Sequence, residues 1–135
     1  MPARGRFLLD SNIVIALLQG DDAVLSNLDR APEVFIPAVV IGELFFGAAK
    51  SARPGENTDK VERFAANRYI VSCDLDVARE YGRLKKRLQE KGRPLPENDI
   101  WIAAMAKLHE MVLVTRDSHF KEVDDLHIVD WAVHL

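Results

Sequence analysis

Four acidic side chains stand out because each lies beside or inside an apolar part of the sequence. Asp10 and Asp117 come shortly after apolar runs, and Asp99 follows a break that contains two prolines. Glu43 lies within an apolar segment, where an ionised carboxylate is costly to bury without a partner. Oxygen donors without His or Cys suit Mg²⁺ or Mn²⁺ rather than zinc. The acids therefore predict a site for Mg²⁺ (or Mn²⁺) as cofactor.

A divalent ion held by carboxylates is suited to hydrolysis of a phosphodiester bond. It lowers the pKa of a bound water, which becomes a nucleophile, and it stabilises charge on the phosphate. We expect all four acids to be catalytic, with Asp10 and Asp99 as the firmest ligands. Glu43 and Asp117 would complete the cluster, through water or by orienting the attacking water. Polar neighbours that would orient the ligands by hydrogen bonds are Ser11, Asn12 and Thr115.

Glu43 is the hardest of the four to explain without a metal. Its helical neighbours three and four positions away are all uncharged: Val39, Val40, Phe46 and Gly47. No local ion pair therefore offsets the carboxylate.

Each acid also has a simpler structural interpretation. Asp10 can cap the helix that follows it, and Asp99 can open a helix, where the dipole favours negative charge. Asp117 can cap the turn through Phe120, and Glu43 can reach out to solvent. Taken one at a time these interpretations compete well, but the joint placement of the four acids favours a metal site.

The elements that must position these acids alternate between short strands and helices. The expected strands are Phe7–Leu9, Val34–Ile36, Tyr69–Cys73, Val112–Val114 and Ile128–Val129. The expected helices are Ile13–Gln19, Asp21–Arg30, Ala38–Lys50, Asp59–Asn67, Asp76–Lys91 and Glu97–His109, with a loop over Ser51–Thr58. This alternation predicts an α/β fold, a short central parallel sheet flanked by helices on both faces. Residues 1–135 would form a single domain, with Asp10 and Asp117 at the same sheet edge.

Bulk composition excludes several classes of protein. With 135 residues and a formal charge of -3, the chain is not a generally basic nucleic-acid binder. Its one cysteine, Cys73, forms no intramolecular disulfide, which fits a cytoplasmic location, and its apolar run predicts a buried thiol. Asp10 to Asn12 interrupt the apolar N-terminal stretch, so we expect neither a signal peptide nor a membrane span. No two of the four histidines stand at metal-ligand spacing, which predicts surface or hydrogen-bonded roles for them.

Four segments of the sequence resemble the acidic motifs of PIN-domain proteins. They are Phe7–Asn12, Ile41–Leu44, Glu97–Ala104 and Val114–Phe120. Chain length and the compact N-terminal start are similar to those of VapC toxins from bacterial and archaeal toxin–antitoxin pairs. The resemblance extends from Phe7 to about Val129, and its most specific parts are Asn98–Ala104 and Thr115–Phe120.

The resemblance implies a PIN-like nuclease domain with defined chemistry and partners. It implies a Mg²⁺- or Mn²⁺-dependent endoribonuclease, the toxin of a type II (VapBC-like) system. It also implies a homodimer and a hetero-oligomer with a cognate antitoxin, whose C-terminal segment covers the acidic site. The family's metal-site acids carry over onto Asp10, Glu43, Asp99 and Asp117, and the fourth is the one that varies in such families.

One apolar segment has two interpretations once this resemblance is considered. Val39–Ala49, with Phe45 and Phe46, is more apolar than one amphipathic helix usually requires. Part of this face forms a dimer or antitoxin groove, or the segment is a central core helix.

Other functions compete with the ribonuclease. A DNA-directed or flap-type metal nuclease would use the same chemistry. A catalytically silent PIN-fold binding module would not need the complete set of acids. A phosphatase with Asp10 as nucleophile lacks a second acid two positions later, where Asn12 stands.

Overall fold

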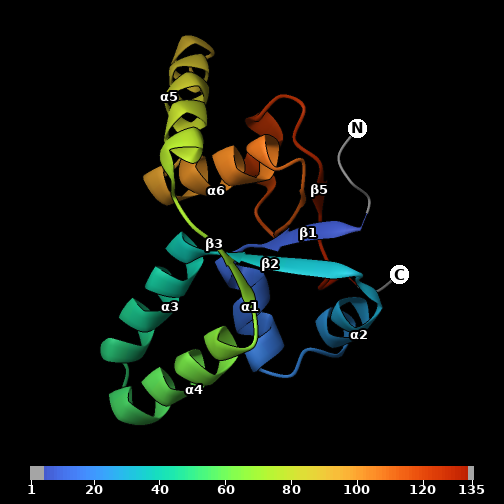
Figure 1. The fold of residues 1–135 in the computed structure, drawn as a ribbon, viewed down its shortest axis with the longest axis vertical. Helices are drawn as coiled ribbons and strands as arrows, with labels where there is room; N and C mark the ends of the chain where they lie inside the picture. Colours follow the sequence, from blue (N-terminus) through green and yellow to red (C-terminus); the bar gives the residue numbers. More distant parts are fainter. Residues whose placement is uncertain (1–4, 134–135) are drawn as a thin grey trace.

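A computed structural model describes residues 5–133 of the chain, which are built around one parallel sheet (Figure 1). Its strands are β1 (Arg6–Leu9), β2 (Glu33–Pro37), β3 (Tyr69–Val71), β4 (Val112–Val114) and β5 (Ile128–Val129). The five strands lie in the order β3-β2-β1-β4-β5, and every pair is parallel. The parallel α/β fold predicted from the sequence is confirmed.

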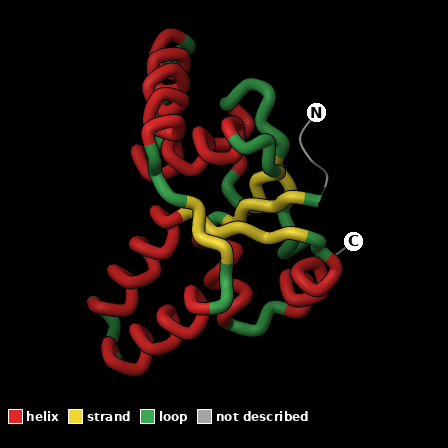
Figure 2. The backbone as a smooth tube through the Cα atoms, viewed as in Figure 1, coloured by secondary structure: helices red, strands yellow, loops and turns green. Residues whose placement is uncertain are grey.

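Helices cover both faces of the sheet. They are α1 (Ser11–Leu18), α2 (Asp22–Arg30), α3 (Ala38–Ala49), α4 (Pro54–Ala66), α5 (Leu75–Glu90), α6 (Glu97–Leu108) and a 3-10 helix, η1 (Ser118–Glu122). Figures 1 and 2 show α5 and α6 on one side of the sheet and α1 to α4 on the other. This division follows from the strand order. The chain passes from β1 to β2 and then to β3 in one direction along the sheet, and it then returns to the other side of β1 to form β4.

That reversal brings β1 and β4 side by side, with Leu9 opposite Val114. A backbone hydrogen bond continues this pairing beyond the end of β1, because Asp10 N donates to Val114 O at 2.9 Å. In open parallel sheets the ligand site lies at the carboxyl ends of the strands where the order reverses. The end of β1 and the end of β4 are therefore where a site is expected.

The sheet edge that carries the site is supported by a fully buried core. Leu8, Leu9, Leu113 and Val114 are all 0% exposed, so the strand ends beside the site are held by apolar packing. Helix α5 packs against the core through one apolar face, and its buried members are Val77, Leu84 and Leu88. Gly20, with φ +81°, ends the α1 segment in a backbone conformation that favours glycine.

Two local predictions are wrong. The segment Ser51–Thr58 is not all loop, because α4 begins at Pro54, where a proline suits the first helical turn. Cys73 is exposed rather than buried. Strand β3 ends at Val71 and pairs on one side only, at the edge of the sheet, so its apolar run does not lead into the core.

Helix α3 buries only one stripe of side chains. Val40, Leu44 and Ala48 are buried, whereas Phe46 is 67% exposed. Phe45 is partly buried and packs against the core. The interpretation of this segment as a central core helix therefore fails for Phe46. Within residues 5–133, none of the helices has the length and apolar character needed to span a membrane.

Candidate metal centre

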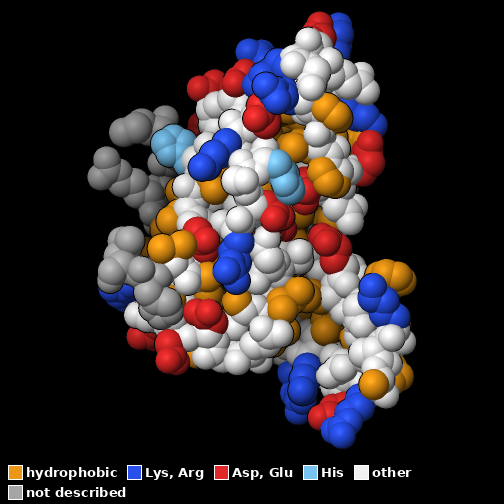
Figure 3. Space-filling model, turned by 180° about the vertical axis from the view of Figure 1, so that it is seen from behind, with side chains coloured by type: hydrophobic (Ala, Val, Ile, Leu, Met, Phe, Trp, Pro, Cys, Tyr) orange, Lys and Arg blue, Asp and Glu red, His pale blue; other side chains and the backbone are white. Residues whose placement is uncertain are grey.

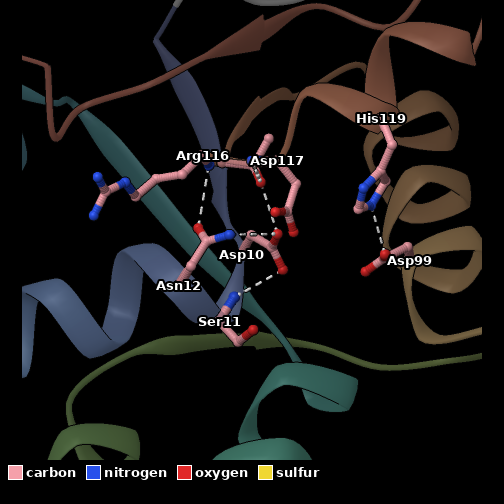
Figure 4. A network of polar contacts seen from close by, with 8 residues as sticks. Asp10, Ser11, Asn12, Asp99, Arg116, Asp117 and His119 are labelled. Atoms are coloured by element: carbon pink, nitrogen blue, oxygen red, sulfur yellow. Dashed lines mark hydrogen bonds and ion pairs between the residues drawn. The ribbon is translucent and has the colours of Figure 1, made fainter. Parts of the chain in front are cut away.

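Asp10 is the most deeply buried acid of the site, with 2% of its surface exposed. It caps α1, and its Oδ1 accepts a hydrogen bond from Ser11 N at 2.8 Å. Its Oδ2 accepts from Thr115 Oγ1 at 2.7 Å, across the junction of β1 and β4 (Figure 4). The capping interpretation of Asp10 is thus correct, and it leaves the carboxylate facing the sheet edge.

The three polar neighbours predicted to orient the ligands all contact Asp10. Ser11 does so through its backbone N–H, and Thr115 through its buried hydroxyl. Asn12 Nδ2 lies 3.5 Å from Asp10 Oδ2, and its Oδ1 accepts from Arg116 N at 3.2 Å. Thr115 Oγ1 also accepts a hydrogen bond from Asp117 N at 3.1 Å. These bonds tie the end of β1 to the loop after β4.

Burial raises the pKa of Asp10 above its ordinary value of 3.8. The hydrogen bonds from Thr115 and Ser11 lower it, and the charges of Asp99 and Asp117 raise it further. The carboxylate therefore lies among like charges in a desolvated position. A bound cation would offset the desolvation and the repulsion, and it would lower the pKa of Asp10.

Glu43 lies on α3 and has an unsatisfied carboxylate oxygen. Its Oε1 is buried and has no hydrogen-bond partner among residues 5–133. Burial raises the pKa of Glu43, the charges of Asp10 and Asp99 raise it further, and the Ser11 side chain lowers it. A buried oxygen of this kind costs free energy unless something binds it, and a divalent cation fits that requirement.

Asp99 and Asp117 approach each other from different elements. Asp99 lies in the first turn of α6, and Asp117 precedes η1 without making a side-chain capping bond to it. One ligand atom from each, together with one from His119, lie within 4.8 Å of one another. The capping interpretation of Asp117 is therefore not supported, and its carboxylate remains available.

His119 is a residue of this site that the sequence argument did not select. Its Nε2 lies 2.7 Å from Asp99 Oδ2 (Figure 4). Spacing between histidines gave no signal, because the neighbour of His119 is an acid. A usable signal was its position two residues after Asp117, in the short turn that follows a strand end.

The four predicted acids therefore come together in two groups. Asp99 and Asp117 form a tight group with His119, while Asp10 and Glu43 lie outside the 4.8 Å group but are coupled to it by charge. In the space-filling view from behind, acidic side chains and a histidine gather near the centre of the surface (Figure 3). A groove lined by α1, α3 and α4 includes Glu43.

The fold and this site correspond to a known family. The sequence matches the PIN domain over residues 7–126, and the chain therefore belongs to the PIN-domain family. It is 30% identical to the "Ribonuclease VapC2" of Haemophilus influenzae over 130 residues, which cover 94% of this chain and 98% of that protein. It is also 30% identical to the "tRNA(fMet)-specific endonuclease VapC" of Shigella flexneri over 131 residues, with 94% and 98% covered.

Solved structures agree with this assignment. A DNA-bound VapBC structure from Salmonella typhimurium contains a chain that matches with a TM-score of 0.88 and 27% identity, covering 93% of this chain and 98% of that one. A chain of VapBC2 from Rickettsia felis, bound to a DNA fragment from their promoter, matches with a TM-score of 0.86 and 27% identity, with 93% and 98% covered. The fold is therefore shared with chains of VapBC complexes.

Proposed function

We propose that this protein is a metal-dependent endoribonuclease that acts as the toxin of a type II, VapBC-like toxin–antitoxin pair. In this proposal residues 1–135 are one nuclease domain, and Asp10, Glu43, Asp99 and Asp117 hold Mg²⁺ or Mn²⁺. The observation that carries the proposal is the buried, unpartnered Oε1 of Glu43, which lies near Asp10, an acid whose pKa is raised by its own burial and by the charges of Asp99 and Asp117. The acids are costly to the fold by themselves, and a cation offsets that cost.

The residues of the chain have separate tasks in this chemistry. When bound, the ion lowers the pKa of a water and stabilises charge on the scissile phosphate. Thr115 and the Ser11 N–H hold the Asp10 carboxylate in one orientation by two short hydrogen bonds. Glu43 supplies a desolvated oxygen from α3. Asp117 lies directly before η1, where its carboxylate can take part in binding the RNA.

RNA as substrate and an antitoxin as partner are supported by the relatives. Two of them are named as a ribonuclease and a tRNA(fMet)-specific endonuclease, and solved neighbours are VapBC complexes. The groove that contains Glu43 also contains Ile15, Leu18 and Leu44, so an apolar segment of an antitoxin has a surface to cover next to the acids. The exposed Phe46 suits a contact with that partner or with a second copy of the chain. We place this pair in the cytoplasm.

A cleavage assay tests the enzyme activity directly. Total RNA and DNA are incubated with the purified protein in Mg²⁺, Mn²⁺ or EDTA, and Asp99→Asn is compared with wild type. RNA cleavage is expected only with an ion, and Asp99→Asn is expected to lose it. Asp76→Asn is the matched control, because Asp76 is an exposed acid paired with Arg79.

Three outcomes would overturn parts of the proposal. RNA cleavage that persists in EDTA, or full activity of Asp99→Asn, removes the metal mechanism. Cleavage of DNA in preference to RNA favours the DNA-directed nuclease. Wild-type protein that binds the ion but cleaves neither polymer favours a silent binding module.

The toxin role has its own test in cells. Expression of the wild-type chain is expected to arrest growth, and co-expression of the small protein encoded next to it should restore growth. Growth that continues at full expression of active nuclease contradicts the toxin role while leaving the nuclease intact.

A further inference from the structure

His119 is a polar side chain at the acidic site that has no task in the chemistry above. We propose that His119 is a positioning residue: its Nε2–H donates to Asp99 Oδ2 and fixes that carboxylate, so that its other oxygen faces the metal. This inference rests on the proposed metal site. It adds a nitrogen to a site that the sequence predicts from oxygen alone.

The geometry of the contact is that of a strong hydrogen bond. Nε2 and Oδ2 are 2.7 Å apart, within the usual range for a donor bound to an ionised carboxylate. The Asp99 side chain is 16% exposed and that of His119 is 38% exposed, so water competes only weakly at the acceptor. The bond joins residues 20 positions apart, on α6 and η1.

His119 is itself held by the core. The next residue, Phe120, is 0% exposed, and its ring centroid lies 5.0 Å from that of the imidazole. The turn is closed behind it by Val123 N, which donates to Phe120 O at 3.1 Å, and Val123 is also buried. The imidazole is therefore presented by an anchored element, which is what a positioning residue needs.

Asp99 is the acid that most needs such a bond. Asp10 has Ser11 N and Thr115 Oγ1 as donors, whereas the only side-chain hydrogen bond of Asp99 within residues 5–133 is the one with His119. Repulsion from the other acids would otherwise turn its side chain outward. An imidazole can donate this hydrogen bond without the permanent positive charge of a Lys or Arg, which would oppose the binding of a cation.

The alternative role for His119 is direct ligation of the ion. Positioning is the role we favour because Nε2 lies 2.7 Å from Asp99 Oδ2, and a nitrogen that donates its proton to Asp99 has no lone pair for the ion. Hydrogen bonds to ligating carboxylates are a general means of fixing their orientation, and the loss of such a partner typically lowers metal affinity by about 10–100-fold.

The test measures Mn²⁺ affinity by calorimetry on the full chain, without any RNA. His119→Ala is expected to weaken Mn²⁺ binding by about 10-fold or more. His119→Gln should stay within about threefold of wild type, because its amide N–H can replace Nε2–H as a donor. The matched control is His127→Ala, an exposed histidine that directly precedes β5 and is not part of the acidic group, which should bind Mn²⁺ as wild type does.

Two spectra separate positioning from ligation and from a structural role. Pulsed electron paramagnetic resonance of the Mn²⁺-loaded protein should show no strong coupling to a directly bound nitrogen. In the metal-free protein, long-range ¹H–¹⁵N spectra should place the imidazole proton on Nε2. The second spectrum still tests the hydrogen bond if His119→Ala fails to fold.

The outcomes divide cleanly. A strong nitrogen coupling that disappears in His119→Ala makes His119 a ligand and overturns the proposal. Three other results would also overturn it: Mn²⁺ affinity of His119→Ala equal to that of wild type, Mn²⁺ affinity of His119→Gln as weak as that of His119→Ala, or an imidazole proton on Nδ1 in place of Nε2. If wild-type protein binds neither Mn²⁺ nor Mg²⁺, the proposed function is what fails, and the Nε2–H result then decides only the hydrogen bond to Asp99.

Discussion

The metal centre and the outer surface of α5 contain the same kinds of acid in opposite electrostatic situations. On and around α5 the carboxylates are paired with cations, in ion pairs of Asp76 with Arg79, Glu80 with Arg83, Glu97 with Lys85, and Asp124 with Arg87 and Lys91. In the metal centre, none of Asp10, Glu43 and Asp117 has an ion-pair partner in the part of the chain that the structure describes. Only the placement of the residues differs.

The pKa directions follow this placement. A hydrogen bond from Lys91 lowers the pKa of Asp124, and one from Lys85 lowers the pKa of Glu97. Burial raises the pKa of Asp10 and of Glu43. Paired surface charges add little to stability, whereas the unpaired, desolvated carboxylates of Asp10 and Glu43 oppose folding. A fold that retains such a cluster has a use for it, and binding a cation is the use that removes the cost.

The largest effect that distinguishes the two regions is on cleavage. Asp10→Asn is expected to lower single-turnover RNA cleavage by about 10³-fold or more, because an ion that loses a buried ligand loses several kcal/mol of charge stabilisation. Asp124→Asn should cleave as wild type does, since Asp124 is an exposed acid that pairs with Arg87 and Lys91. Comparable rates for the two variants would remove the distinction between the regions.

The next largest effect is on thermal stability in the presence of an ion. Mg²⁺ or Mn²⁺ at about 100 times its dissociation constant should stabilise the folded state by about 2.7 kcal/mol. For a chain of this size that corresponds to a rise in Tm of about 10 °C. The double variant Asp10→Asn, Asp99→Asn should show no such rise. An equal rise in that variant would mean that the ion binds elsewhere, at the paired acids for instance.

Sequence reasoning found the acids because the physics behind them is local. An acid at the end of an apolar strand and an acid inside an apolar helix are visible in the order of residues, as with Asp10 and Glu43. Strand order was less visible, but alternation alone gave a parallel sheet, and a parallel sheet brings the strand ends to one edge.

What the sequence could not provide depends on three-dimensional contacts. The bond from His119 to Asp99 joins residues that no periodicity relates. The exposure of Cys73 depends on β3 lying at an edge, which follows from strand order and not from the apolar run itself. The start of α4 at Pro54 was missed because Pro, Gly and Asn in one segment favour a loop. A helix whose first turn contains Pro, Gly and Asn has the same local sequence as such a loop.

A smaller effect concerns the free energy of unfolding without metal. The folded-state pKa of Glu43 lies above its ordinary value of 4.5, so its stabilising contribution is present below that value and is lost as the pH rises through the raised one. Glu43→Gln removes the buried charge. At pH 7 and in EDTA it should be more stable than wild type by about 1 kcal/mol, or about 3 °C in Tm.

The Glu43→Gln comparison is made across pH. Its advantage in Tm over wild type should shrink as the pH falls from 7 toward 4.5, and excess metal should reverse it, since only wild type gains the ion. An advantage that is independent of pH would show that the carboxylate charge is not the cause.

The smallest effect comes from the paired surface, and its sign is opposite. The pKa of Asp124 is lowered mainly by its hydrogen bond from Lys91, so its contribution is present above the ordinary value of 3.8 and is lost as the pH falls through the lower folded-state value. Asp124→Asn should therefore lower Tm at pH 7, by less than Glu43→Gln raises it, because the pair is exposed and screened. High salt should remove this loss and leave the Glu43→Gln gain in place. If salt removes both changes equally, the acids of the metal centre are as solvated as those on α5, and the contrast on which the metal proposal stands is lost.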